Sequence, residues 1–100
     1  MIKKGAKVNG LRPEMVLAYV ICAPIMAKYG QDMVLTEGTG GKHSKTSRHY
    51  IGMAMDLRTW TLTDRDACTA ELREALSDEY VVVLHDTHIH IQFNGSINRL

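Results

Sequence analysis

Two separate segments of the chain carry side chains that bind metal ions. The first segment carries His49 and Asp56, seven positions apart. The second carries His88 and His90 in a His-x-His pattern. Two neutral imidazoles and one carboxylate can hold zinc tetrahedrally with the fourth position open to water. The chain therefore has the donors for one catalytic Zn²⁺, although the same donor types accept several other divalent metals.

The first segment follows a loop and enters a short strand. Residues 37–47 have no hydrophobic periodicity and are rich in Gly, Lys, Ser and Thr, which is typical of a loop. Functional residues are often found on such loops when a rigid scaffold holds them. Residues 54–57 then predict a strand in which Met55 and Leu57 enter the core. Asp56 would point to the opposite side, toward the site.

The second segment predicts a hairpin with a polar face. Residues 80–84 are rich in β-branched side chains and predict a buried strand, and Asp86-Thr87 is a candidate two-residue turn. Residues 88–93 alternate, so that His88, His90 and Gln92 face one way while the apolar side chains between them face the other. Both histidines are therefore expected on one polar face.

Two helices and one further strand complete the expected elements. Pro13 suits the first turn of a helix that Gly30 would end, and the apolar residues recurring at helical spacing are Val16, Leu17, Val20, Ile21 and Ile25. Residues 33–36 predict a strand. A capping box of Thr63 and Asp66 would begin the second helix, whose expected inward residues are Cys68, Leu72, Ala75 and Leu76.

The length and composition indicate one domain that spans residues 1–100, with 94–100 as a loosely held tail. With 45% hydrophobic residues and a formal charge of +1, the chain lacks the basic signature of a nucleic-acid binder. We expect an α+β fold, a small antiparallel sheet that carries the metal site with two main helices packed on it. Cys22 and Cys68 have no metal-site spacing and are expected as buried free thiols.

No segment predicts a membrane or export role. Residues 5–10 lack the apolar run that would follow the basic start of a signal peptide, and residues 15–27 are too short to span a bilayer. We therefore expect a protein that is cytoplasmic at synthesis, with no membrane partner. Its size and the lack of apolar surface patterning suggest a monomer.

The same segments resemble the zinc-site segments of a known group of proteins. The LAS group contains the M15-type D-Ala-D-Ala metallopeptidases, the lysostaphin-type peptidases and the signalling domain of hedgehog proteins. The resemblance covers about residues 11–93 and is especially close to short phage and bacterial peptidases of peptidoglycan. Its most specific part is Ser47-x-His49-x-x-Gly52-x-Ala54-x-Asp56, flanked by Thr36-Glu37-Gly38, His43-Ser44, residues 81–84 and His88-Ile89-His90.

The resemblance implies a hedgehog-like or D-Ala-D-Ala peptidase-like fold and assigns the metal ligands. It makes His49, Asp56 and His90 the ligands of one Zn²⁺, as in the subgroup where the second His of His-x-His binds the metal. A different registration, based on the Glu-x-x-His of other M15 enzymes, would choose His88 instead. Both assignments remain open from the sequence.

One departure from the family pattern concerns the general base. Relatives have a Glu where this chain has His85. His88 is then the first candidate to move the proton, since an imidazole suits that role near neutral pH, and His43 is the second. His85 and the neighbouring Asp86 follow as third choices.

Several residues beside the metal segment are candidate substrate contacts. Ser47 can orient a ligand or touch substrate, while Arg48 and Lys42, with Lys45, can hold a substrate carboxylate by charge-assisted bonds. Ser47 is equally consistent with an ordinary loop hydroxyl, and basic side chains such as these are more often simply solvated. Tyr50 and Trp60 are candidates to line the cleft, although aromatic residues next to a strand usually belong to the core or the rim.

The sequence thus leads to two hypotheses of different classes. In the first, the chain is a zinc-dependent peptidoglycan peptidase, a D-Ala-D-Ala carboxypeptidase or stem-peptide endopeptidase of endolysin type, acting on the cell wall if it is derived from a phage. In the second, it is a non-catalytic zinc-binding module whose peptidase-like site binds a peptide, cell wall or protein partner. Turnover of cell wall distinguishes them.

Overall fold

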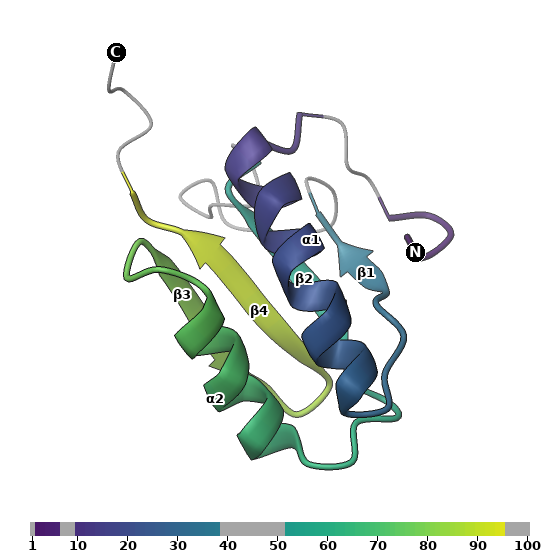
Figure 1. Cartoon of the computed structure of the whole chain (residues 1–100). Coiled ribbons are helices and arrows are strands. Elements are labelled where there is room, and N and C mark those ends of the chain that lie inside the picture. The colour runs from purple at the N-terminus through teal and green to yellow at the C-terminus, as the bar shows by residue number, and fades with distance from the viewer. Residues whose placement is uncertain (1, 7–9, 39–51, 96–100) are drawn as a thin grey trace.

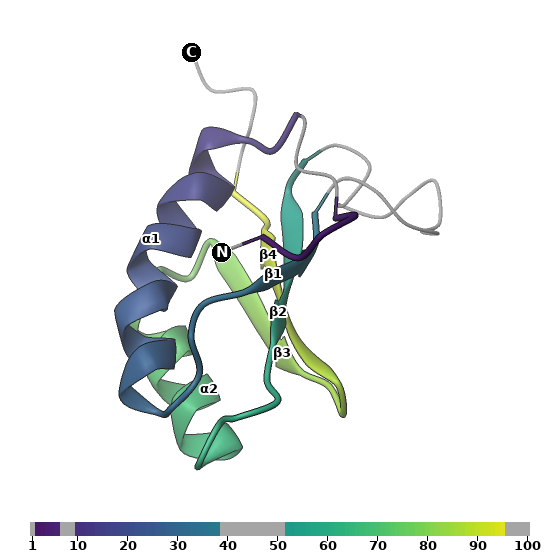
Figure 2. The ribbon, with the colours of Figure 1, turned by 90° about the vertical axis from the view of Figure 1, so that its right-hand side faces the viewer.

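The structure, a computed structural model, describes residues 2–6, 10–38 and 52–95. Its four strands form an antiparallel sheet in the order β1-β2-β4-β3. Both helices lie on one face of this sheet (Figures 1 and 2). The expected α+β class is therefore confirmed. In chain order the elements are α1 (Pro13–Lys28), β1 (Leu35–Glu37), β2 (Ala54–Arg58), α2 (Arg65–Ala75), β3 (Tyr80–Leu84) and β4 (His88–Phe93).

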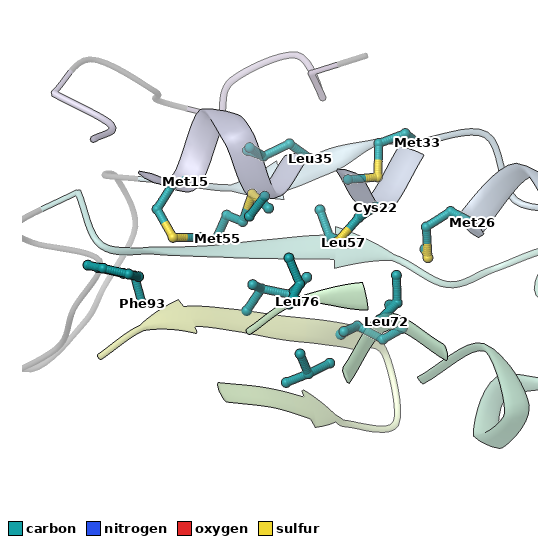
Figure 3. Close-up of a cluster of buried hydrophobic side chains, with 14 of the residues drawn as sticks. Met15, Cys22, Met26, Met33, Leu35, Met55, Leu57, Leu72, Leu76 and Phe93 are labelled. Atoms are coloured by element: carbon teal, nitrogen blue, oxygen red, sulfur yellow. The ribbon is translucent and has the colours of Figure 1, made fainter. Parts of the chain in front are cut away.

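The core fills the space between the helices and the sheet. Figure 3 shows side chains from both helices and from the sheet gathered there, and all those labelled are buried. Alternation on the strands decides which side chains enter: Met55 and Leu57 of β2 and Ile89 and Ile91 of β4 are fully buried. The residues between them therefore face the side of the sheet that the helices leave uncovered.

Helix α1 turns only part of the expected apolar stripe to the core, since Ile21 and Ile25 are half-buried and pack against it. Val16, Leu17 and Val20 are 51%, 56% and 62% exposed. The fully buried residues of α1 are Met15, Ala18, Cys22 and Met26. Almost every residue of this helix is apolar, so hydrophobicity does not distinguish its faces. The small Ala18 and Cys22 and the flexible methionines permit close approach to the sheet, which explains why this face is chosen.

Helix α2 begins with a different cap from the expected one. The side chain of Asp64 accepts a hydrogen bond of 3.0 Å from the Ala67 N–H, so Asp64 is the N-cap and the predicted Thr63–Asp66 capping box is wrong. The Thr63 hydroxyl instead donates to the carbonyl of Tyr29 at the end of α1. Cys68, Leu72 and Leu76 are buried as expected, but Ala75 is exposed because it lies on the solvent side of the helix.

Two strand predictions also need correction. β1 begins at Leu35 rather than at residue 33, although Met33 and Val34 before it are buried. β3 has the predicted bounds but is not a buried strand, since Val82 is its only buried residue and Val81 is 38% exposed. The reason is position: β3 is an edge strand, and the helices cover only one face of the sheet.

The free thiols are where the sequence placed them. Cys22 and Cys68 are both buried and unbridged. Burial raises the pKa of Cys22 to about 12 and that of Cys68 to about 11, so neither is a reactive thiolate near neutral pH. Within the described residues, neither helix has the length and apolar character needed to cross a membrane.

Candidate functional site

The sheet brings Asp56 and His90 together from segments far apart in the sequence. Asp56 lies in the middle of β2 and is the direct cross-strand partner of His90 on β4. Both strands are central in the sheet, so their backbone positions are fixed on both sides. Because Met55, Leu57 and Ile89 point into the core, Asp56 and His90 project from the uncovered face.

The Asp56 carboxylate is approached by two imidazoles. His90 Nδ1 lies 2.9 Å from Asp56 Oδ1, and His88 Nε2 lies 3.8 Å from the same oxygen. The three side chains are partly buried, with 14% of Asp56, 20% of His90 and 31% of His88 exposed. Each of these three side chains is therefore largely shielded from bulk water but still accessible from solvent.

The donor pair fits a metal ion in type and spacing. Two donors on a tetrahedral zinc with bonds of 2.0–2.1 Å are about 3.3 Å apart. The separation of 2.9 Å between His90 Nδ1 and Asp56 Oδ1 differs from this by a few tenths of an ångström. The two atoms lie at hydrogen-bond distance, and a small rotation of either side chain would make room for a cation between them.

Gln92 holds the other nitrogen of His90. Gln92 Oε1 lies 3.2 Å from His90 Nε2, and the Gln92 amide donates in turn to Asn94 Oδ1 at 2.7 Å. The hydrogen bond to Asp56 raises the pKa of His90; burial opposes this rise, and the bond to Gln92 adds to it. A protonated His90 thus has an acceptor for each N–H, and the proton competes with a metal ion for Nδ1.

The hairpin tip places His85 beside His88. Their ring centroids are 4.7 Å apart, and the ring of His85 lies 6.4 Å from that of His90. The Thr87 hydroxyl is 3.0 Å from His88 Nδ1, which leaves Nε2 as the nitrogen directed toward Asp56. The tip is held from α2 by Arg65, whose Nη2 donates to the carbonyls of His85 and Asp86 at 2.6 and 2.8 Å.

The other predicted site residues lie outside the described residues. These are the ligand candidate His49, the proton-transfer candidate His43, the substrate candidates Ser47, Arg48, Lys42 and Lys45, and Tyr50, the candidate to line the cleft. In residues 2–6, 10–38 and 52–95, no cluster of three or more His, Cys, Asp or Glu is arranged to hold a metal ion. The described part of the site is therefore the pair of Asp56 and His90 with His88 beside it, and the assignment of His49 as third ligand stays a prediction.

Sequence reasoning missed two residues on the same face. The alternation of β4 predicts the face of Gln92 but no role for it, and Arg58, two positions after Asp56, belongs to no motif in the sequence. Arg58 is the cross-strand partner of His88, just as Asp56 is that of His90. Strand alternation applied one step further would have put Arg58 on this face.

Comparison of the chain with protein-family models, with curated proteins and with solved structures gives no match.

Proposed function

We propose that the chain is a zinc-dependent peptidase of peptidoglycan, a D-Ala-D-Ala carboxypeptidase or stem-peptide endopeptidase of endolysin type with a hedgehog/D-Ala-D-Ala peptidase-like fold. The observation that carries the proposal is the pairing of Asp56 with His90 on the uncovered face of the sheet, with His88 Nε2 3.8 Å from the same carboxylate oxygen. A carboxylate and an imidazole held at metal-ligand spacing, beside a second imidazole, suit metal-assisted hydrolysis.

In this proposal His49, Asp56 and His90 hold the metal. Zinc in such a site supplies a water acidified toward neutral pH and a Lewis acid that polarises the scissile carbonyl. Gln92 acts on His90 from behind: its amide oxygen faces Nε2 and so directs Nδ1 toward the metal position. Asp56 contributes the negative charge that balances the cation.

His88 moves the proton. Its Nε2 faces the site, while the Thr87 hydroxyl occupies its Nδ1. His88 Nε2 therefore takes the proton from the attacking water and delivers it to the leaving amine. His85, exposed at the hairpin tip, and His43, outside the described residues, are the other candidates for this step.

A second candidate function is a non-catalytic zinc module that binds a peptide, cell wall or protein partner. What favours it is His85, which stands where the resembling enzymes have the Glu that serves as general base. His85 is exposed, and Arg65 holds its backbone carbonyl rather than its ring. The two candidates share the metal site and differ in turnover.

The test combines metal content with cell-wall cleavage in one preparation. We expect one zinc per chain by elemental analysis, and release of peptide or D-alanine from purified peptidoglycan that a chelator stops. His90→Ala and His49→Ala should lose both zinc and cleavage. His88→Ala should keep the zinc and lose cleavage by roughly 10²- to 10⁴-fold, the range for a lost general acid or base.

His85→Ala, at the same hairpin tip, distinguishes the two imidazoles: cleavage close to the unmodified rate assigns the proton transfer to His88, and a loss equal to that of His88→Ala would assign it to His85. One zinc without cleavage of any stem peptide would favour the binding module. A chain that binds no zinc would refute both functions.

A further inference from the structure

Arg58 lies beside Asp56 and His90, on the same face of the sheet as these two proposed metal ligands. It is two positions from Asp56, so the Cα atoms of the two residues are about 6.6 Å apart along the strand. Across the sheet its partner is His88. A guanidinium group is therefore carried by the residue next to Asp56 on the same face of β2.

The guanidinium of Arg58 is held in place but is not neutralised. Its Cζ lies 3.8 Å from the ring centroid of Trp60, and Trp60 is itself 74% exposed. Arg58 Nε is buried with no hydrogen-bond partner, and no carboxylate in the described residues pairs with the group. A partly buried arginine normally finds an anion or several acceptors, so this one is prepared for an acceptor from outside.

A hollow of about 370 Å³ opens next to this stacked pair. Among the described residues that line it, Arg58 alone carries a positive charge and Asp32 alone a negative one. The side chain of Gln31 is already engaged, since it accepts from the Thr61 N–H and donates to the carbonyl of Asp32. Arg58 is therefore the group available to bind an anion there. The other lining residues are Gly30, Val34, Trp60 and Thr61.

We infer that Arg58, stacked on Trp60, binds the terminal carboxylate of the peptide substrate on the leaving-group side of the scissile bond. The inference rests on the proposed peptidase function and makes its specificity that of a carboxypeptidase. One residue of extended peptide spans about 3.3–3.6 Å. The distance from Asp56 to Arg58 thus suits a carboxylate one or two residues beyond a carbonyl bound at the metal. The planar fork of Arg58 can hold that carboxylate with two parallel hydrogen bonds.

A binding experiment without turnover tests the inference directly. Nα-acetyl-D-alanyl-D-alanine and its C-terminal amide are titrated into the metal-free protein, and the NMR signals of Arg58 Nε–H and of the indole N–H are followed. The indole signal is unambiguous because Trp60 is the single tryptophan. We expect the acid to shift both signals and the amide to bind roughly ten- to a hundredfold more weakly, the worth of a charged hydrogen bond.

Variants distinguish bidentate binding by the Arg58 guanidinium from attraction by positive charge elsewhere on the protein. Arg58→Met should bind acid and amide alike, and Arg58→Lys should recover only part of the preference because it lacks the bidentate geometry. Arg12→Met is the matched control, since Arg12 is an exposed arginine at the start of α1, in the helical layer. It should keep the full preference for the acid. Asp32→Asn should keep or strengthen it, since it removes the opposing charge.

Equal shifts from acid and amide in the unmodified protein, or an unchanged preference in Arg58→Met, would overturn the inference. The zinc-loaded protein then tells this failure from failure of the proposed function. Cleavage of acid and amide at equal rates would leave the peptidase standing without a carboxylate subsite. A preference for the acid that is lost in Arg58→Met would support the subsite even in a chain that cleaves neither probe.

Discussion

At the scale of single residues, the candidate site depends on one carboxylate oxygen. Asp56 Oδ1 is 2.9 Å from His90 and 3.8 Å from His88, so both imidazoles compete for the same atom. The closer contact decides the chemistry of the metal-free protein, because it gives His90 a partner that favours its charged form. The site without metal is thus a proton-binding site.

The pKa of His90 provides a prediction. Its hydrogen bond to Asp56 raises the pKa above the ordinary value for histidine, and Asp56→Asn should lower it again. For a raised pKa, the stabilisation is present in full below the unfolded-state pKa and is lost as the pH rises through the folded-state pKa. The metal-free protein should therefore lose stability over this window, while zinc affinity rises over it.

An NMR titration of the His90 ring in both proteins measures the pKa, and urea unfolding at several pH values measures the stability. A His90 pKa that is the same with Asp56 and with Asn at this position would show that the two side chains do not interact in solution.

At the scale of elements, helix α1 shows that hydrophobicity alone does not determine which face of a helix is buried when nearly all of its residues are apolar. Of the residues that recur at helical spacing, Val16, Leu17 and Val20 are exposed, and only Ile21 and Ile25 pack against the core, whereas Ala18 and Cys22 are fully buried. The hairpin of β3 and β4 shows the opposite case. Its strict alternation of polar and apolar residues allowed the sequence to place His88 and His90 on the uncovered face.

Two substitutions in α1 distinguish the observed face from the expected one. Met26→Ala should lower the free energy of unfolding by about 2–5 kcal/mol, because it leaves a cavity between helix and sheet. Val20→Ala should change it by no more than about 0.5 kcal/mol, since Val20 is 62% exposed. Urea denaturation followed by circular dichroism measures both. If Val20→Ala were the more damaging change, the helix would be rotated from the orientation described.

At the scale of the whole molecule, the two-layer arrangement puts the hydrophobic core on one face of the sheet and the candidate site on the other. The helices cover one face of the sheet (Figure 2), and the core lies between them and the sheet. Asp56, Arg58 and His90 alternate with the buried residues of β2 and β4 and so lie on the other face. The ligands Asp56 and His90 come from the two central strands, β2 and β4. A metal ion bound by Asp56 and His90 would link β2 to β4 in the middle of the sheet.

Zinc should therefore stabilise the whole fold. At a free zinc concentration of one hundred times the dissociation constant, binding to the folded chain alone adds about 2.7 kcal/mol. For a domain of this size, that raises the Tm by roughly 10 °C or more. Differential scanning calorimetry with and without zinc measures the shift.

His85→Ala should keep this increase in Tm and His90→Ala should abolish it. The same increase in His90→Ala as in the unmodified chain would place the metal elsewhere.

The sequence by itself determined the α+β class, the approximate position of each strand and helix that the structure describes, and the face on which Asp56, His88 and His90 lie. It could do so because alternation and helical spacing are local properties that survive folding. Only the tertiary structure decided which face of α1 is buried, the register that sets Asp56 opposite His90, and the stacking of Arg58 on Trp60 beside an open hollow. These depend on packing between segments distant in the chain, where shape and close approach select among arrangements that the local pattern leaves equal.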